Sequence, residues 1–368
     1  MNKLLAVLLF LIIFSNLASP VLADEFLKAT VTAIPNQGET IGDSGTIPFQ
    51  DLNLKVLDGS LKGKVIGLTY GKNISLTQSQ LLGVGDTVII DKSVNSGGSP
   101  LFEIMDKYRL NSVIPILVLF FLVVIALSQL KGAGSILGMF ISLGVIVGFI
   151  VPEILKGQNP LVISVVGCLF IMVTTIYLAH GFSRKTTIAV ISTFLTLVGT
   201  ALLSSLFVQM TSLTGLGSED AASLRFAVST ANIDFRGLLL GGILIGTLGV
   251  LDDVTTGLSA SVYELIKANP KISFWQLFNS GLSIGKEHIS SLVNTLVLAY
   301  AGASLPIFIT IVINPNHYPL WIVLNDGMIM EEVVRTLAGS IGLVAAVPLT
   351  TLMASYYFAK IRRPTLSE

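Results

Sequence analysis

From residue 111 onward the sequence consists largely of apolar runs that can cross a lipid bilayer. A helix of ~20 such residues spans about 30 Å of hydrocarbon. We place about seven transmembrane helices, at roughly 111–130, 134–152, 160–180, 187–209, 237–257, 289–313 and 337–359. Charged residues make up only 12% of the chain, against ~25% in soluble domains. The sequence therefore predicts a polytopic α-helical membrane protein, residues 111–360, whose main partner is the lipid bilayer.

The first 23 residues have the layout of a secretory signal peptide. Lys3 provides a positive start, the residues from Leu4 to Phe14 are all apolar, and small residues precede Asp24. This pattern predicts a signal peptide over residues 1–23. An uncleaved anchor helix is the alternative, and either form sends the following residues across the membrane.

Residues 24–110 differ in character, because apolar and polar residues alternate between Gly, Asp and Asn. They predict five or six short strands in a small β-barrel or sandwich, OB-like in spacing. The string Gly83–Asp86 resembles an intramembrane aspartyl protease motif, but its place before a strand favours a turn. The string Gly42–Thr46 resembles a serine-protease loop, yet this domain has no histidine to act as a base.

Basic residues indicate the orientation. The predicted inner loops carry Lys131, Arg184, Lys185, Lys267, Lys271, Lys286, Lys360, Arg362 and Arg363, and the outer loops carry Lys156, Arg225, Arg236 and Arg335. Because Lys and Arg favour cytoplasmic loops, the β domain is predicted outside and the tail, 361–368, in the cytoplasm. The net charge is zero, which gives no excess for binding nucleic acid.

The first candidate site lies between Gly237 and Ile266. Gly242, Gly246 and Gly249 are expected to pack against another helix, and Asp252 and Asp253 follow. If the helix continues beyond them, Asp252, Thr256 and Ser259 form part of a polar stripe suited to a proton or cation. If the helix instead reaches the cytoplasmic interface there, both carboxylates are solvated.

Two further clusters are candidates. On the next helix Glu287, His288, Asn294 and Thr295 are expected to line or gate the path, with His288 relaying protons to the Asp pair. The alternatives are an interfacial cluster around Lys286 and a helix-to-helix hydrogen bond from Asn294. Before the last helix Glu331, Glu332 and Arg335 form either an outer gate or ordinary ion pairs. Cys168 is expected in the core, His180 as an anchor and His317 in a loop.

Three segments resemble the YibE/F family of bacterial membrane proteins. They are LDDVTTGLSASVYEL, GKEHISSLVNTLVLAYAGASLPIFI and EEVVRTLAGSIGLVAAVPLTTLMASYY, within roughly residues 100–360. The resemblance implies a multi-pass plasma-membrane protein that pairs with a smaller relative or forms a homo-oligomer. The acidic residue in a glycine-rich helix is also similar to the SecD/SecF and RND permease halves, where the pattern accompanies proton-driven work. This chain differs by lacking a large domain between its first two helices.

Two classes of function follow. The first is a secondary transporter or proton-coupled translocation component. The second is a non-transporting receptor or assembly scaffold that binds a ligand or partner through the β domain. No nucleophile with its base, metal-ligand cluster or phosphate loop occurs in the sequence, so we expect no enzyme activity, no cofactor and no metal site.

Overall fold

The computed structural model describes residues 25–42, 45–71, 76–94, 100–227, 232–314 and 317–361. The predicted signal peptide, two residues of the Gly42–Thr46 string and the predicted cytoplasmic tail beyond Ile361 lie outside the described residues. The chain divides into two compact units between residues 126 and 127, and each is described by itself.

The first unit contains an antiparallel sheet of five strands. Its strands are β1 (Glu25–Gly42), β2 (Gly45–Val56), β3 (Val65–Tyr70), β4 (Thr87–Val94) and β5 (Pro100–Lys107), with two short 3-10 helices, η1 (Gly59–Leu61) and η2 (Gln78–Gln80). The strand order is β3-β2-β1-β4-β5. The long β1 pairs with β4 near its start, at Glu25–Thr30, and with β2 from Ala29 onward. The result is a half-barrel, which confirms a β domain with five of the predicted strands.

Alternating residues of the sheet form the core of this unit. Leu27, Leu54 and Ile90 are fully buried, whereas their neighbours along the strands face outward. Alternation arises because successive side chains in a strand point to opposite faces. Gln50 is the buried polar residue of this core, and its amide both donates to and accepts from the backbone of Leu82.

The string Gly83–Asp86 forms the predicted turn. The Asp86 carboxylate accepts a hydrogen bond from the Gly83 amide at 2.9 Å. Gly85 has a φ of +95°, which lies in the left-handed region that glycine adopts readily. The string is therefore a tight turn before β4.

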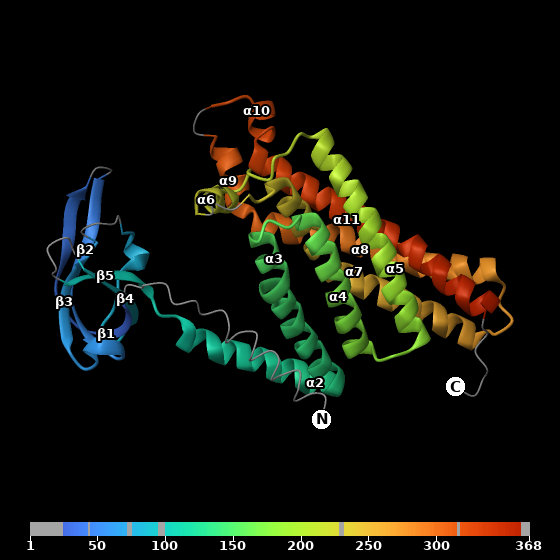
Figure 1. The fold of residues 1–368 in the computed structure, drawn as a ribbon, viewed down its shortest axis with the longest axis horizontal. Helices are drawn as coiled ribbons and strands as arrows, with labels where there is room; N and C mark the ends of the chain where they lie inside the picture. The colour runs from blue at the N-terminus through green and yellow to red at the C-terminus, as the bar shows by residue number, and fades with distance from the viewer. Residues whose placement is uncertain are drawn as a thin grey trace. The chain divides into compact units, whose positions relative to one another are not determined.

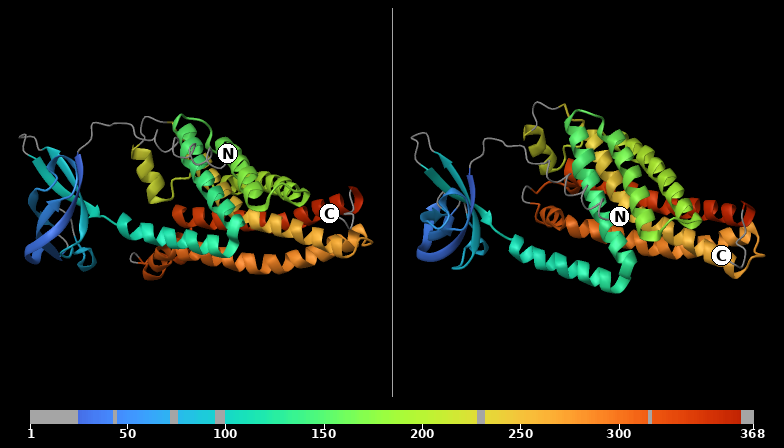
Figure 2. Two further views of the ribbon diagram at one scale, coloured as in Figure 1. Left: turned by 90° about the horizontal axis from the view of Figure 1, so that it is seen from below. Right: turned by 60° about the horizontal axis from the view of Figure 1, so that its bottom comes forward.

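The second unit is helical. Its elements are α2 (Leu110–Val145), η3 (Ile146–Ile150), α3 (Val151–Leu155), α4 (Pro160–His180), α5 (Arg184–Met210), α6 (Glu219–Ala227), α7 (Phe235–Ala268), α8 (Phe274–Ala303), α9 (Leu305–Ile313), α10 (Leu320–Leu324), α11 (Gly327–Tyr356) and η4 (Tyr357–Ile361), with the start of α2 belonging to the first unit. The helices α4, α5, α7, α8 and α11 lie side by side in a bundle (Figures 1 and 2).

By length and composition, five stretches of the described residues can span a membrane, or six if the bent pair α8–α9 counts as one span. One stretch runs over Leu110–Leu155, and 46 helical residues would measure ~69 Å. It is interrupted at Gln129, whose φ of 50° and ψ of −130° are not helical. The break lies one residue before the end of the predicted helix 111–130 and ahead of the predicted helix 134–152. The count of seven stays a prediction.

The helix bounds differ most from the predicted ones where polar residues continue a helix. The helix α4 has the predicted bounds, but α7 continues beyond the predicted end at residue 257 to Ala268, and α8 begins at Phe274 instead of residue 289. Both extensions contain Ser and charged residues that end an apolar run without ending a helix. A bend of 69° separates α8 from α9.

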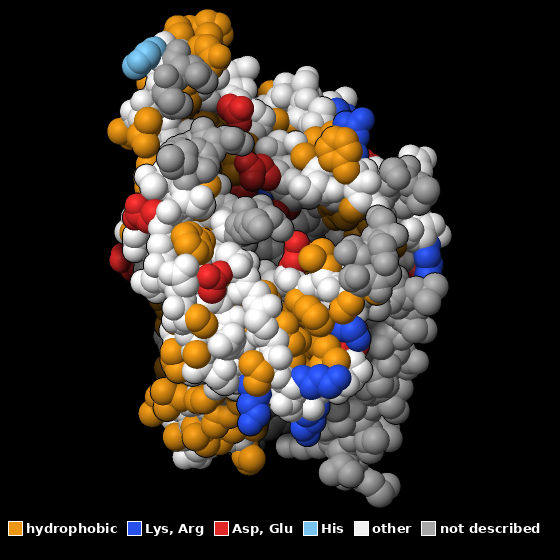
Figure 3. All heavy atoms as spheres, turned by 90° about the vertical axis from the view of Figure 1, so that its left-hand side faces the viewer, with side chains coloured by type: hydrophobic (Ala, Val, Ile, Leu, Met, Phe, Trp, Pro, Cys, Tyr) orange, Lys and Arg blue, Asp and Glu red, His pale blue; other side chains and the backbone are white. Residues whose placement is uncertain are grey.

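The centre of the bundle is formed by α5, α7 and α11, which pack closely through small and hydroxyl residues. A Cβ atom added to Gly342 of α11 would lie 2.3 Å from the Thr200 hydroxyl of α5. Cys168 is fully buried in the adjoining apolar core, as predicted. Many large hydrophobic side chains are nevertheless exposed on the helices, as suits a bundle with lipid as its solvent. Figure 3 views the molecule from the side that is on the left in Figure 1, and hydrophobic side chains are visible there among polar and charged ones.

Candidate ion-coupling site

Asp252 lies halfway along the 34 residues of α7. Its Oδ1 atom is buried and has no hydrogen-bond partner among the residues that the structure describes. The helix continues for four further turns, so the carboxylate does not stand at a helix end. The helix continues past the Asp pair, as the first alternative, a polar stripe on a continuous helix, requires.

Asp252 forms part of the wall of a cavity of about 410 Å³ between α2, α4 and α7. Its wall also carries three hydroxyl side chains, Ser135 and Ser142 of α2 and Thr175 of α4. The Ser142 and Thr175 hydroxyls donate to carbonyls of their own helices, so their oxygen lone pairs remain able to accept. The cavity thus combines one carboxylate with hydroxyl oxygens, which suits a hydrated proton or a hard cation.

Asp253 differs from Asp252, because its side chain is exposed. His180, at the C-terminal end of α4, lies within electrostatic range of Asp253, Lys131 and Lys185. Ala179, the neighbour of His180, contributes to the Asp252 cavity. His180, which we expected only as an anchor, is therefore the histidine with an electrostatic interaction with Asp253.

The polar residues that follow the Asp pair attach α7 to α5. The Thr255 and Thr193 hydroxyls are 2.7 Å apart, and the Ser259 hydroxyl donates to the Lys185 carbonyl at 2.7 Å. Thr256 is half-buried and donates to the Asp252 carbonyl. The Ser259 hydroxyl thus joins α7 to α5, whereas the Thr256 hydroxyl bonds within α7, to the backbone of Asp252.

The glycines of α7 make room either for a neighbouring helix or for the side chains of other helices. A Cβ on Gly241 would lie 2.3 Å from the Ser164 hydroxyl, so the closest helix approach occurs there. Gly242 and Gly246 instead face side chains, the Arg335 guanidinium and the Tyr300 hydroxyl, at ordinary contact distances, and Gly249 borders the Asp252 cavity. These three glycines, predicted to pack against a helix, line one stripe that leads along α7 toward Asp252.

A second cavity, of about 270 Å³, lies at the other end of that stripe. Glu331 and Arg335 of α11 and Ser164 of α4 contribute to its wall. The buried Glu331 accepts a hydrogen bond from the Gly217 amide, and the Arg335 Nε lies 3.4 Å from the Glu332 carboxylate. Ile146 and Ile245 form part of the walls of both cavities, so the cavities are neighbours separated by two apolar side chains.

The candidates on α8 lie elsewhere. Glu287, His288, Asn294 and Thr295 are exposed and belong to the outward face of α8. None of them contributes to the Asp252 cavity. The structure therefore does not bring His288 to the Asp pair.

Sequence reasoning missed the α2 hydroxyls of the site, because they stand within an apolar run. It also missed a row of hydroxyls on α5 that lies outside the cavity. The buried Ser192, Thr196, Thr200 and Ser204 recur every four residues, a spacing that places them on one face and could have been found. No group of three or more His, Cys, Asp or Glu side chains that could hold a metal ion occurs within the described part of the chain.

The fold and the site define a helical membrane protein with a separate β domain and a carboxylate-lined cavity within its bundle. A family model described as YibE/F-like protein matches residues 116–360, and the chain belongs to this family. No curated protein and no solved structure matches the chain.

Proposed function

We propose that the chain is an ion-coupled secondary transporter in which Asp252 binds the coupling proton or cation. The observation that carries this proposal is the buried, unpartnered Oδ1 of Asp252 in a hydroxyl-lined cavity. An ionisable side chain at membrane depth costs several kcal/mol unless it is paired, hydrated or neutralised. Reversible neutralisation by a proton or a cation is the chemistry of a coupling site.

The path we propose follows the glycine stripe of α7. It leads from the cavity of Glu331 and Arg335 to the cavity of Asp252, about 15 Å further along the helix. Ile146 and Ile245 separate the two cavities and act as an apolar barrier that moves when the path opens. Residues 146–150 form a π-helix, a local irregularity that is frequent at functional sites.

Orientation and partners belong to the same proposal. The basic loops place the β domain outside the plasma membrane and the C-terminus in the cytoplasm. Polar side chains on the exposed face of α8, Asn294 and Thr295 among them, are costly beside lipid. A second copy of the chain or a smaller relative would cover this face. In this proposal the chain acts as a transporter rather than as an enzyme.

A cysteine at Gly249 tests the coupling site, because this position borders the cavity and the natural Cys168 can be replaced by Ala. We would measure its reaction with an impermeant thiol reagent from each side of the membrane between pH 5 and 8. We expect one-sided access and a pH dependence that disappears in the Asp252→Asn background. A cysteine at the exposed Gly257 corrects for titration of the thiol itself.

The opposite result has a definite meaning. If Gly249→Cys reacts equally in both backgrounds at every pH, Asp252 does not control the cavity and the coupling proposal fails. The receptor or scaffold function, with the β domain as its binding part, would then become the working hypothesis.

A further inference from the structure

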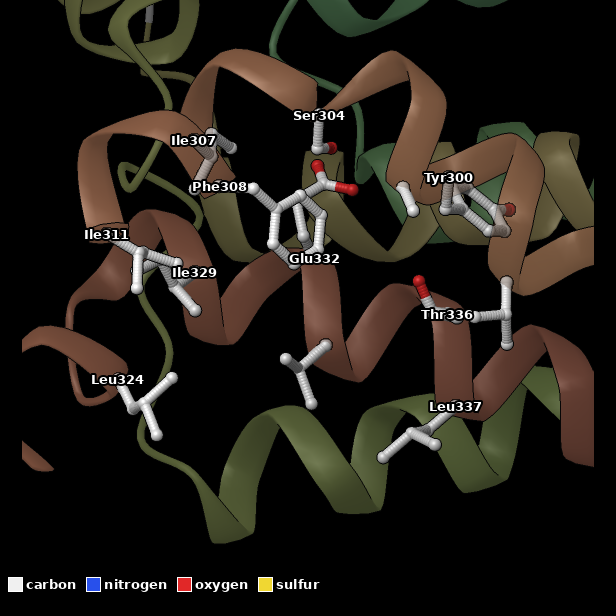
Figure 4. Close-up of a pocket in the computed structure, with 13 residues that line it drawn as sticks. Tyr300, Ser304, Ile307, Phe308, Ile311, Leu324, Ile329, Glu332, Thr336 and Leu337 are labelled. Atoms are coloured by element: carbon white, nitrogen blue, oxygen red, sulfur yellow. The ribbon is translucent and has the colours of Figure 1, made fainter. Parts of the chain in front are cut away.

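A third cavity lies where the bend between α8 and α9 meets α11 (Figure 4), and it shares no lining residue with the two cavities of the proposed path. Its volume is about 310 Å³, at the lower end of the range for small-molecule sites. Its wall is almost entirely apolar, with Ile307, Phe308, Ile311, Leu324 and Ile329 among the lining residues. Such a wall binds an apolar body and offers few partners to a polar one.

The ionisable group with a negative charge in this wall is Glu332. Figure 4 shows its carboxylate directed toward Ser304 at the bend, and the Phe308 ring lines the same cavity. The Tyr300 ring also lines the cavity. A carboxylate together with aromatic rings is the combination that attracts a cation.

The nearby arginine balances only part of the negative charge of α11. Arg335 Nε is 3.4 Å from the Glu332 carboxylate, and the neighbouring Glu331 accepts a hydrogen bond from the Gly217 amide. The charged side chains within α11 are Glu331, Glu332 and Arg335, so their formal charges sum to −1. An organic cation entering the apolar cavity would supply the missing positive charge.

We propose that this cavity is a binding site for a lipophilic monocation, such as an amine or onium compound with a hydrophobic body. Glu332 provides the charge complement, and the Tyr300 and Phe308 rings contact the apolar groups of the ligand. The inference stands on a cavity that shares no lining residue with the Asp252 cavity.

Tetraphenylphosphonium is a suitable probe because tetraphenylborate has nearly the same shape and the opposite charge. We would titrate each ion into the purified full chain in detergent, with a micelle blank, and measure heat. We expect the cation to bind about tenfold or more tightly than the anion. Glu332→Gln should lower cation affinity by about tenfold and leave anion affinity unchanged or higher, whereas Glu264→Gln, an exposed acid on α7, should match the natural chain.

Equal binding of the two ions, or cation binding unaffected by Glu332→Gln, would overturn the proposal. If Glu332→Gln fails to fold, Ile311→Trp gives a second test, since it fills the cavity and keeps the carboxylate. Loss of cation binding in Ile311→Trp supports the site, and retention refutes it. Asp252→Asn should leave binding of the lipophilic cation unchanged, because Asp252 does not line this cavity. The cation-binding proposal and the ion-coupling proposal can therefore fail independently of each other.

Discussion

At single positions the bundle depends on glycines that leave no room for a side chain. Gly342 faces the β-branched Thr200, and a Cβ there would lie 2.3 Å from the hydroxyl and 3.3 Å from Thr200 Cβ. Rotation of the threonine cannot relieve both contacts. Gly257 of α7, by contrast, has nothing within 4 Å of an added Cβ.

These two glycines give a matched pair of substitutions. Gly342→Ala should destabilise the bundle by ~1–3 kcal/mol, because an extra methyl group in a packed interface forces the helices apart. Gly257→Ala should be neutral or stabilising, since alanine favours helix by up to ~1 kcal/mol. Unfolding of both variants in a denaturing-detergent titration checks the difference, and equal stabilities would show that α5 and α11 do not approach as closely as described.

In the β domain, hydrogen-bonded carboxylates make the stability depend on pH, and Glu25 is the leading example. Glu25 accepts hydrogen bonds from Lys92 and Ser60, which lower its pKa from 4.5 to about 2. Because the pKa is lower in the folded state, the stabilisation is complete above pH 4.5 and is lost as the pH falls toward 2. The Asp86 pKa is also lowered, first by the Gly83 amide and then by Lys107, which adds to the loss in the same direction.

We therefore expect protection of the β1 amides against hydrogen exchange, corrected for the intrinsic rate, to decrease from pH 4.5 to pH 2. Glu25→Gln should show weaker protection at pH 6 and a shallower decrease on acidification. Measurement of peptides covering residues 25–42 in the full chain tests this. An unchanged slope in Glu25→Gln would assign the acid sensitivity to other carboxylates.

At the scale of helices, hydroxyl pairs connect α5 to α7. The Thr193 and Thr255 side chains are buried, and each also has a carbonyl of its own helix within hydrogen-bond distance. Valine at either position keeps the shape and removes the bond between the helices. We expect a coupling energy of ~0.6 kcal/mol, and at most ~1.7 kcal/mol, from the double-mutant cycle of Thr193→Val and Thr255→Val.

Additive effects of the two valines would show that the hydroxyls bond only to their own helices. Ser261→Ala is a suitable control, because its hydroxyl donates to the Gly257 carbonyl of the same helix. It should give no coupling with Thr193→Val.

The sequence predicts helices well where apolarity is continuous and poorly where polar residues extend them. The bounds of α4 follow from a run that ends in a charged loop, but α7 and α8 contain hydroxyls and glycines that pack inside the bundle. Asp252 was found from the sequence because a carboxylate in an apolar helix is conspicuous. The cavity around it was not, because its α2 and α4 residues become neighbours of α7 only through the tertiary fold.

The sequence also did not reveal which helices the histidines face. His288 shares a helix face with polar residues, which suggested a relay, whereas His180 stands at a helix end. Periodicity within one helix gives the face of a residue but not the helix that this face meets. The electrostatic proximity of His180 and Asp253 depends on the packing of α4 beside α7.

At the scale of the whole molecule, the two units have separate cores. The β domain buries its own apolar cluster around Leu54, and the bundle buries others between its helices. A unit with its own core and satisfied strand pairing is able to fold without the rest of the chain. The β domain is therefore expected to fold without the bundle.

This independence predicts that a fragment of residues 24–108 folds cooperatively in water, with a β-sheet circular dichroism spectrum. Leu54→Ala should cost the fragment ~2–5 kcal/mol, because Leu54 is fully buried and its removal leaves a cavity. Val65→Ala, at a position 62% exposed, should cost less than ~0.5 kcal/mol. Urea unfolding of the three fragments measures these differences. A fragment without a cooperative transition would mean that the β domain needs the bundle to fold, and that its separate core is not sufficient for stability.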